Sequence, residues 1–289
     1  MAADVALRFG MPRLARIGAL ALAMLTAACS QAEIESHFVP SADLWERWTS
    51  HDPRAVTTIN HEAWSHLLGK YVSRDNDGLN RFAYRNVTAA DRKLLADQIA
   101  YLEGVPISRY NRKEQFAYWA NLYNAVTVRT ILDNYPVKSI RDINDGFLSP
   151  GPWNRKLTTV EGVALSLNDI ENRILRPIWR DPRVHYAVNC ASIGCPNLRK
   201  TAFTASGLDR TLDSAARDYI NSPRGVRIRA DGTLVVSSIY IWFQSDFGDT
   251  KGDVLTHLRR YAGPALKPRL SAPSVLRRYD YDWALNEQR

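Results

Sequence analysis

The stretch of sequence that decides the fold is residues 111–134, which read NRKEQFAYWANLYNAVTVRTILDN. Asn111 followed by Glu114 is a capping pattern typical of a helix start, and Tyr135-Pro136 is a pattern that stops a helix. Between them, large apolar residues recur at helical spacing on one face, while alanine, valine and threonine leave little polar surface on the other. The pattern therefore predicts a long helix that is buried in the protein.

Two amides interrupt this apolar helix. Asn121 and Asn124 are three residues apart and therefore share one side of it. A buried amide without hydrogen-bond partners costs about 1–3 kcal/mol, so each amide must find partners. They either hold the backbone of a neighbouring loop or line a pocket, and the sequence leaves both interpretations open.

The rest of the chain predicts a helix-rich protein with few strands. Helix patterns cover residues 61–68, 88–102, 166–175, 206–220 and 253–261, and strand patterns cover residues 184–188, 226–230 and 234–243. Asp231-Gly232 suits the turn of a hairpin between the last two strands. Strands and helices do not alternate regularly, and no linker divides the chain after residue 40. We therefore expect a single helix-rich α+β domain with a small, mostly antiparallel sheet.

The composition is that of a folded protein without a nucleic-acid partner. The 289 residues are 45% hydrophobic and 24% charged, which is enough apolar material for a core and excludes a disordered chain. Basic and acidic residues are interleaved without a run of five like charges. This pattern is typical of a solvated surface.

The first 28 residues differ in kind from the rest. Arg8, Arg13 and Arg16 precede the uncharged run of residues 17–28, an order typical of a signal peptide. The run is too short for a membrane-spanning helix, which needs roughly 20 residues. Removal of residues 1–28 takes away three Arg and one Asp and lowers the formal net charge from +8 to +6.

A cysteine, Cys29, follows this predicted signal peptide. It is preceded by Leu25-Thr26-Ala27-Ala28, which resembles the bacterial lipobox, whose cysteine receives diacylglycerol. Ordinary signal cleavage beside the same small residues is the alternative. Ser30 favours sorting to the outer membrane, so we expect a periplasmic lipoprotein of the bacterial cell envelope. The expected organisation is a signal peptide over residues 1–28, a lipid-anchored tether with a first helix over residues 29–54, and the domain over residues 55–289.

Cys190 and Cys195 are the remaining cysteines. An even pair in an oxidising compartment favours a disulfide, and a turn containing Gly194 permits the approach. A catalytic thiol, a redox-active pair and a metal site are the alternatives. The redox interpretation lacks the Cys-x-x-Cys spacing, and the metal interpretation lacks a fourth ligand. The sequence predicts no bound metal and no cofactor.

Other chemically active side chains surround this pair. On an extended chain His185 and Asn189 share one face, and Ser192 lies between the two cysteines. An aromatic-rich strand over residues 234–243 leads to Asp246, where a carboxylate either orients an imidazole, as in a catalytic triad, or caps a turn. The catalytic candidates are His185, Cys190 and Asp246, and the pocket candidates are Asn121, Asn124, Asn189 and Ser192.

Five distinct motifs occur along the chain. They are residues 114–125 (EQFAYWANLYNA), 165–176 (LSLNDIENRILR), 181–199 (DPRVHYAVNCASIGCPNLR), 238–247 (SIYIWFQSDF) and 281–286 (YDWALN). Together they resemble the family catalogued as domain of unknown function 547, over roughly residues 55–286. The resemblance implies that bacterial members are often exported or lipid-anchored, and that plant and animal members carry the domain fused to other modules. It implies no activity.

A second, weaker likeness concerns the order of elements. The order of a helix, a strand bearing His185 and a later strand ending at Asp246 is similar to the order in transglutaminase-like and papain-like cysteine enzymes. Their nucleophile lies at the start of the core helix, where this chain offers Asn121 and Asn124 and no cysteine. Either Cys190 serves from a different position, or the fold has lost the activity, or the analogy is false.

Two functions are expected from these observations. The first is a lipid-anchored binding or scaffolding module with a polar cleft, whose partners are the membrane and an envelope protein or peptide. The alternative is a cysteine-dependent acyl-transfer enzyme, such as a peptidase, an amidase or a transglutaminase-like enzyme. It would use Cys190 as nucleophile, His185 as base and Asp246 or Asn189 as the orienting group. A disulfide between the two cysteines argues against the enzyme.

Overall fold

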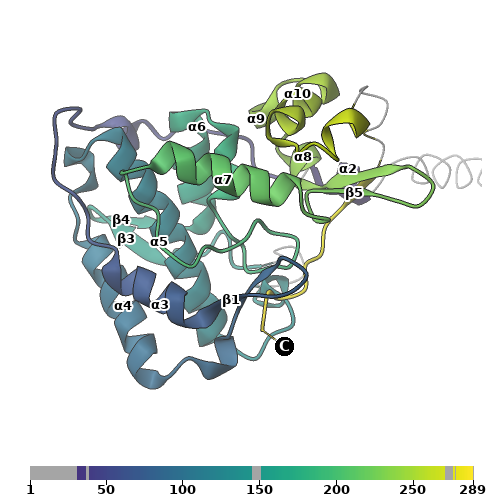
Figure 1. Ribbon diagram of the computed structural model, residues 1–289. Helices are drawn as coiled ribbons and strands as arrows, with labels where there is room; N and C mark the ends of the chain where they lie inside the picture. The colour runs from purple at the N-terminus through teal and green to yellow at the C-terminus, as the bar shows by residue number, and fades with distance from the viewer. Residues whose placement is uncertain (1–30, 37–38, 145–150, 271–275, 277, 289) are drawn as a thin grey trace, which may run out of the picture.

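The computed structural model describes residues 31–36, 39–144, 151–270, 276 and 278–288 (Figure 1). The predicted signal peptide and Cys29 lie outside these residues. The α-helices are α2 (Gln31–Ser36), α3 (Glu62–Tyr71), α4 (Ala89–Glu103), α5 (Arg112–Asp133), α6 (Arg176–Trp179), α7 (Leu208–Ile220), α8 (Ile239–Trp242), α9 (Gln244–Phe247) and α10 (Lys251–Tyr261), and η5 (Asp169–Leu175) is a π-helix. The 3-10 helices are η1 (Glu46–Thr49), η2 (Tyr84–Asn86), η3 (Ile107–Arg109), η4 (Ile140–Asp142), η6 (Pro182–Tyr186) and η7 (Lys267–Arg269). The strands are β1 (Val72–Arg74), β2 (Asn80–Phe82), β3 (Thr158–Val160), β4 (Val163–Leu165), β5 (Val226–Ile228), β6 (Leu234–Ser237) and β7 (Arg278–Asp280).

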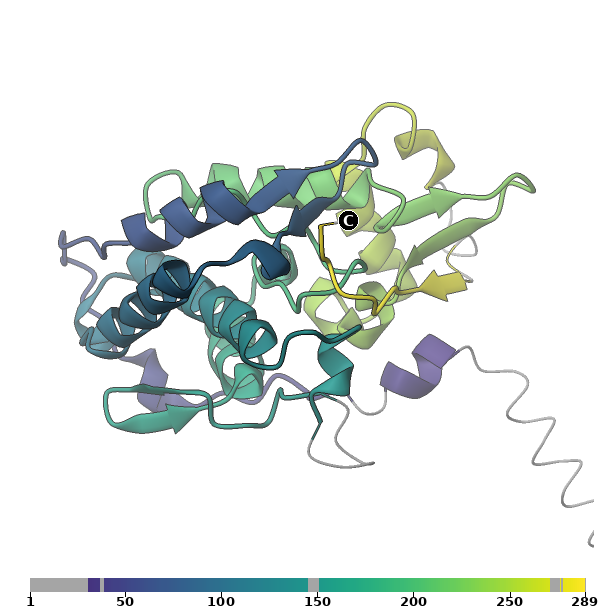
Figure 2. The ribbon, with the colours of Figure 1, turned by 90° about the horizontal axis from the view of Figure 1, so that it is seen from below.

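The central helix is α5, as the sequence predicts. Asn111 caps it, because its side-chain oxygen accepts from the backbone N–H groups of Lys113 and Glu114. Every residue from Glu114 to Val128 is buried. The other helices and the loops that surround α5 are seen together in Figure 2. The prediction of a long buried helix is therefore confirmed.

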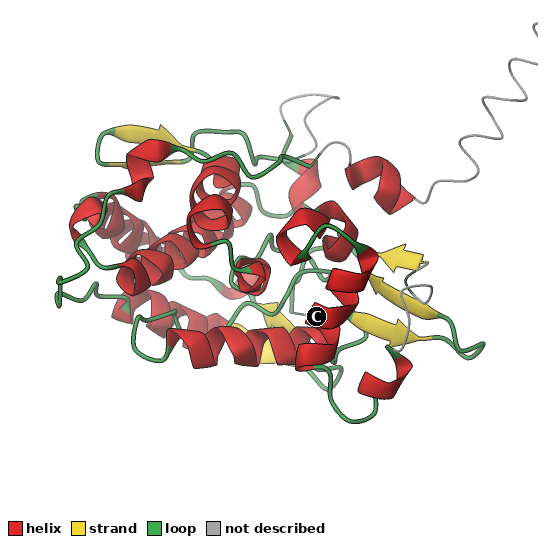
Figure 3. Ribbon diagram, turned by 90° about the horizontal axis from the view of Figure 1, so that it is seen from above, coloured by secondary structure: helices red, strands yellow, loops and turns green. Residues whose placement is uncertain are grey.

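The strands of the described residues form three small sheets, shown in yellow in Figure 3. β1 pairs with β2, β3 with β4 and β5 with β6, all antiparallel, while β7 adds to β6 in parallel. The prediction of a helix-rich α+β fold with small, mostly antiparallel sheet structure is confirmed. Most strands pair with the next strand in the sequence, so they form separate small sheets and not one larger sheet.

The predicted strand over residues 234–243 is wrong beyond Ser237. The backbone N–H of Ser238 donates to the carbonyl of Asp280 at 3.0 Å, and that of Trp242 donates back to Ser238 at 2.9 Å, which begins α8. The alternating apolar residues suited a strand covered on both faces, but packing on both sides serves a short helix equally well. Asp246 consequently lies in α9 and not at the end of a strand.

The predicted strand over residues 184–188 is also wrong. The segment is the 3-10 helix η6, followed by a loop. Asp181 caps this helix by accepting from the backbone N–H of Arg183 at 2.9 Å, and Pro182 occupies the first turn, where its missing N–H costs nothing. His185 is therefore displayed by a helical turn.

The described part of the chain forms two hydrophobic cores. One surrounds α5, and the other fills the space between α7, α10 and the sheet β5-β6-β7. The C-terminal segment, residues 281–287, runs between distant parts of the fold: the Leu285 N–H donates to the Lys138 carbonyl, and the Phe82 N–H donates to the Asn286 carbonyl, both at 2.8 Å. None of the helices in the described part of the chain has the length and apolar character needed to span a bilayer.

Candidate functional site

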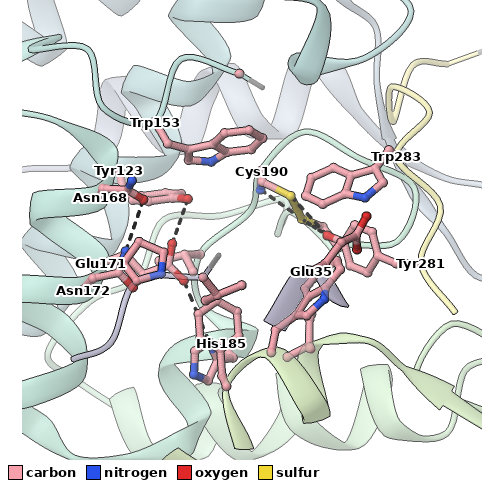
Figure 4. A pocket seen from close by; sticks show the side chains of 18 of the residues that line it. Glu35, Tyr123, Trp153, Asn168, Glu171, Asn172, His185, Cys190, Tyr281 and Trp283 are labelled. Carbon is pink, nitrogen blue, oxygen red and sulfur yellow. Dashed lines mark hydrogen bonds and ion pairs between the residues drawn. A yellow bond between two sulfur atoms is a disulfide. The ribbon is translucent and has the colours of Figure 1, made fainter. Parts of the chain in front are cut away.

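A cavity of about 530 Å³ lies where η5, η6, α8 and the C-terminal segment meet (Figure 4). It is within the range of about 300–1,000 Å³ that is usual for small-molecule sites. Figure 4 shows Asn168, Glu171 and Asn172 on one side, and Tyr281, Trp283 and the cysteine pair on the other. We name these two sides the polar wall and the aromatic wall.

The polar wall is a chain of hydrogen-bonded amides. The Asn172 Nδ2 donates to Asn168 Oδ1 at 3.1 Å, and the Asn168 Nδ2 donates to Asn154 Oδ1 at 2.7 Å. At the other end, Arg176 Nη1 donates to Asn172 Oδ1 at 2.8 Å. Each amide is therefore held in one orientation by its neighbour, which fixes where the wall presents donors and acceptors.

Glu171 completes the polar wall. Its Oε2 accepts from the Tyr123 hydroxyl at 3.0 Å, and Tyr123 comes from the buried helix α5. Burial, reinforced by the charge of Glu171, raises the pKa of Tyr123 well above its usual value, so the hydroxyl stays protonated as a donor. The second carboxylate oxygen of Glu171, Oε1, lies 3.9 Å from His185 Nδ1, and Glu171 lines the cavity.

The aromatic wall consists of Trp242, Tyr281 and Trp283. Their ring centroids are 4.8 Å apart for Trp242 and Tyr281, 4.7 Å for Tyr281 and Trp283, and 5.6 Å for Trp242 and Trp283. Trp153 meets the edge of Trp283 at 5.8 Å and joins the aromatic wall to the polar one. These rings pack against one another and are partly exposed, so each offers carbon surface to the cavity.

His185 lies on the floor of the cavity and is paired with Asp246. Its Nε2 is 2.7 Å from Asp246 Oδ2, and its Nδ1 is 3.9 Å from Glu171 Oε1. The ring stacks on Phe243 with a centroid distance of 4.2 Å, which fixes its plane. The structure thus brings together His185 and Asp246, which are 61 residues apart in the chain.

Asp246 is also held by Arg176, through Arg176 Nε at 2.5 Å and Nη2 at 3.1 Å. The side chains of Arg176 and His185 are each 2% exposed, and that of Asp246 is 17% exposed. Burial opposes ionisation of Asp246, but the hydrogen bonds from His185 and Arg176 outweigh it and lower the pKa to about 2. Asp246 is therefore an ionised carboxylate that orients the imidazole and does not cap a turn.

Cys190 and Cys195 form a disulfide, with their Cα atoms 6.3 Å apart. The disulfide prediction is confirmed, and both residues line the cavity. Cys190 is therefore not a free thiol in this structure, which removes the nucleophile that the acyl-transfer alternative needs. Within the described residues no cluster of three or more His, Cys, Asp or Glu is arranged to hold a metal ion.

The two predicted pocket amides of α5 do not line the cavity. The Asn121 side chain donates to the Phe203 carbonyl at 2.8 Å and accepts from the Phe203 N–H at 2.9 Å. The Asn124 side chain donates to the Ala187 carbonyl at 2.9 Å and accepts from the Asn189 N–H at 2.8 Å. Both amides hold the backbone of neighbouring loops, the first of the two interpretations that the sequence left open.

Asn189 and Ser192 lie behind the cavity wall and not on it. Asn189 donates from Nδ2 to the Pro196 carbonyl at 2.7 Å and accepts from the Ala191 N–H at 2.8 Å, so it braces the loop between the cysteines. Ser192 is 1% exposed, and its hydroxyl donates to that of Tyr281 at 3.0 Å. Both side chains therefore stabilise the loop itself, because their polar atoms already have hydrogen-bond partners in the chain.

Sequence reasoning missed most of the residues that form the two walls. The spacing of Asn168, Glu171 and Asn172 by three and four residues was a usable signal, because it places their side chains near one another on a helical turn. Tyr281 and Trp283 stood in a conspicuous aromatic motif, but nothing local indicated what they would face. The cavity forms only when distant segments meet.

The fold and the cavity together define an α+β protein with a small-molecule-sized site built around a buried helix. A family model described as "Protein of unknown function, DUF547" matches residues 107–220, a region that contains His185 and both cysteines. The match supports the family that the five motifs resemble, over residues 107–220 of the chain. Asp246 and the C-terminal segment lie beyond the matched region. No curated protein and no solved structure matches the chain.

Proposed function

We propose that this protein is a binding module of the bacterial cell envelope, and that its cavity takes a neutral, hydroxyl-bearing ring of the saccharide class. The observation that carries the proposal is the pairing of an aromatic wall with an opposite wall of fixed amides. A sugar ring has one face of C–H groups, which packs on aromatic rings, and an edge of hydroxyl groups, which both donate and accept hydrogen bonds.

The charges around the cavity favour a neutral ligand. Glu35 and Arg141, both lining residues, lie 3.7 Å apart between Oε1 and Nη1 and offset each other. Arg141 also lies over the ring of Trp283 at 5.1 Å. Asp246 is balanced by Arg176 and lies behind His185. Glu171 is the remaining carboxylate of the polar wall, and a carboxylate is a strong acceptor for a ligand hydroxyl.

Ligand binding is monitored by tryptophan fluorescence, because Trp153, Trp242 and Trp283 all line the cavity. Neutral monosaccharides, disaccharides and N-acetylated sugars are titrated against the purified protein. We expect a saturable change for at least one of them, and a 10- to 100-fold weaker affinity in Glu171→Gln, because a hydrogen bond to a charged acceptor contributes about 1.5–3 kcal/mol. Glu62→Gln, at an exposed position of α3 outside the cavity, is the matched control and leaves the affinity unchanged. Absence of binding by the whole panel refutes the saccharide assignment.

The envelope location is part of the same proposal and rests on residues 1–30. Mass spectrometry of the mature protein tests it: the expected amino terminus is Cys29 carrying acyl chains. An unmodified terminus at another residue removes the lipid anchor and the predicted outer-membrane location, while the cavity and its ligand are unaffected.

A second candidate, cysteine-dependent acyl transfer, is favoured by one observation, the 2.7 Å contact between His185 and Asp246. It requires Cys190 to be released from the disulfide first. Alkylation of the reduced protein tests it: an activated Cys190 thiolate reacts rapidly near neutral pH, and His185→Ala slows the reaction. Reaction at the rate of an ordinary thiol in both proteins rejects the enzyme.

A further inference from the structure

The disulfide occupies an unusual position for a structural cross-link, since it forms part of the cavity wall (Figure 4). Cys190 is partly exposed, whereas Cys195 is 3% exposed. A disulfide reacts when a thiolate attacks one of its sulfur atoms and the other leaves. Because Cys190 is the more exposed residue, we infer that a molecule in the cavity attacks its sulfur and that the Cys195 sulfur leaves.

The loop between the cysteines is held by backbone hydrogen bonds as well as by the disulfide. The N–H groups of Ile193 and Gly194 donate to the carbonyls of Ala284 and Asp282 at 2.8 and 2.7 Å, and the Asn286 N–H donates to Ala191 at 3.0 Å. A Cβ at Gly194 would lie 2.9 Å from the Asp282 nitrogen, so the close approach of the two segments requires glycine.

Asn189 adds two more hydrogen bonds, to Ala191 and Pro196, across the same loop. Ala191 has a φ of 59°, in the left-handed region that costs a residue with a side chain free energy of order 1–3 kcal/mol. The surrounding hydrogen bonds hold this conformation. When the disulfide opens, the two sulfur atoms therefore stay close enough to join again.

The buried sulfur has donors already in place. The Cys190 N–H donates to Cys195 Sγ at 3.0 Å, and the Tyr281 hydroxyl lies 3.1 Å from the same sulfur. Ser192 donates to the Tyr281 oxygen, which orients the Tyr281 hydrogen toward the sulfur atoms. Burial raises the pKa of Tyr281 well above its usual value, so this hydroxyl stays protonated as a donor. Hydrogen bonds of this kind strengthen when the acceptor becomes an anion.

We propose that the Cys190–Cys195 disulfide is redox-active and exchanges with a low-molecular-weight thiol that enters the cavity. The thiol loses its proton to solvent, and its sulfur bonds to Cys190 Sγ while the bond to Cys195 breaks and Cys195 leaves as a thiolate held by the Cys190 N–H and Tyr281. A second thiol also loses its proton to solvent and attacks the sulfur of the bound thiol, so a disulfide of two small thiols departs and Cys190 becomes a thiolate. Two electrons pass from the two thiols to the protein disulfide, and the reverse sequence restores it.

The first experiment uses the unmodified protein in glutathione buffers of varied redox ratio, with thiol trapping and peptide mapping at equilibrium. We expect oxidised and reduced forms to be populated across the series, with the same circular dichroism spectrum for both. A disulfide that stays fully oxidised in millimolar glutathione while the protein is folded overturns the proposal, as does unfolding on reduction. This experiment involves no saccharide, so its result is independent of the binding test.

Two variants assign the roles of the residues. Cys195→Ser is expected to accumulate a mixed disulfide with glutathione on Cys190, because the resolving sulfur is absent. Tyr281→Phe is expected to slow reduction about tenfold, since it removes a hydrogen bond to the leaving thiolate. Tyr110→Phe, which removes a phenol that does not line the cavity, is the matched control and keeps the normal rate. Equal rates in Tyr281→Phe and in the control refute the role of the hydroxyl.

Discussion

Replacement of Asp246 by Asn tests the buried charge network under the cavity. The change keeps the size of the side chain and removes its charge, which leaves the Arg176 guanidinium, 2% exposed, without its carboxylate. Breaking a buried ion pair costs about 3–5 kcal/mol, because the remaining charge stays desolvated. Asp246 itself is 17% exposed, which places the expected loss of unfolding free energy at the lower end, about 3 kcal/mol at pH 7.

The pH dependence of this loss has a defined sign. The Asp246 pKa is lowered from its usual 3.8 to about 2 in the folded protein, which corresponds to about 2 kcal/mol of stabilisation. Because the folded pKa is the lower one, this stabilisation is present in full above the unfolded value and is lost as the pH falls toward 2. The difference in stability between the unmodified protein and Asp246→Asn therefore shrinks by about 2 kcal/mol between pH 7 and pH 2.

The assay is urea unfolding followed by tryptophan fluorescence and circular dichroism at several pH values. Asp97→Asn is the control, because Asp97 forms an exposed pair with Lys93 and such pairs contribute within about 0.5 kcal/mol. Comparison of variant with parent at each pH removes the effect of the other carboxylates. A loss below about 1 kcal/mol at pH 7, or a difference that stays constant down to pH 2, refutes the reasoning.

Three further substitutions test the scaffold by the same unfolding assay. Asn121→Ala leaves the buried N–H and carbonyl of Phe203 without partners and is expected to cost about 2–4 kcal/mol, so a cost below 1 kcal/mol contradicts the bracing role. Thr88→Ala removes the cap of α4 and is expected to cost about 1 kcal/mol, which an unchanged midpoint would disprove. Gly225→Ala places a Cβ 2.1 Å from the Tyr219 carbonyl oxygen, so we expect a loss of about 3 kcal/mol or more, and full stability would show that the turn relaxes at little cost.

The elements that the sequence predicts well are those with local signals. The Asn111 cap predicts where α5 begins, and the apolar periodicity after it predicts that the helix continues. Both signals act between residues three or four positions apart, so a short window of sequence contains them. The segment after Ser237 was misjudged because alternating aromatic residues suit a strand, while the ending of β6 depends on Asp280, more than 40 residues further on. The sequence contains a signal for η6, since Asp181-Pro182 is typical of a helix start. The strand prediction instead rested on the short apolar run after these two residues.

The candidate site was only partly predictable for a related reason. His185, Asp246 and the cysteine pair stood out by residue type, and the structure brings each of the two pairs together. Asn121 and Asn124 were equally prominent, yet their hydrogen bonds go to loop backbone whose position no local pattern reveals. The walls depend on how segments more than 100 residues apart meet, and this information is carried by packing and not by motifs.

The long-range contacts of the C-terminal segment affect how the protein folds during its synthesis. Tyr84 bonds to Asn286, 202 residues further along the chain, and Tyr281 closes both the aromatic wall and the surroundings of the disulfide. During synthesis, α5 can pack against α4 and η5 before the C-terminal segment emerges, because both elements lie closer to it in the chain. The cavity, however, cannot exist until residues 281–287 have emerged, and contacts of such long range form slowly. The nascent protein therefore remains a partly folded chain with an open site until residues 281–287 pack against it.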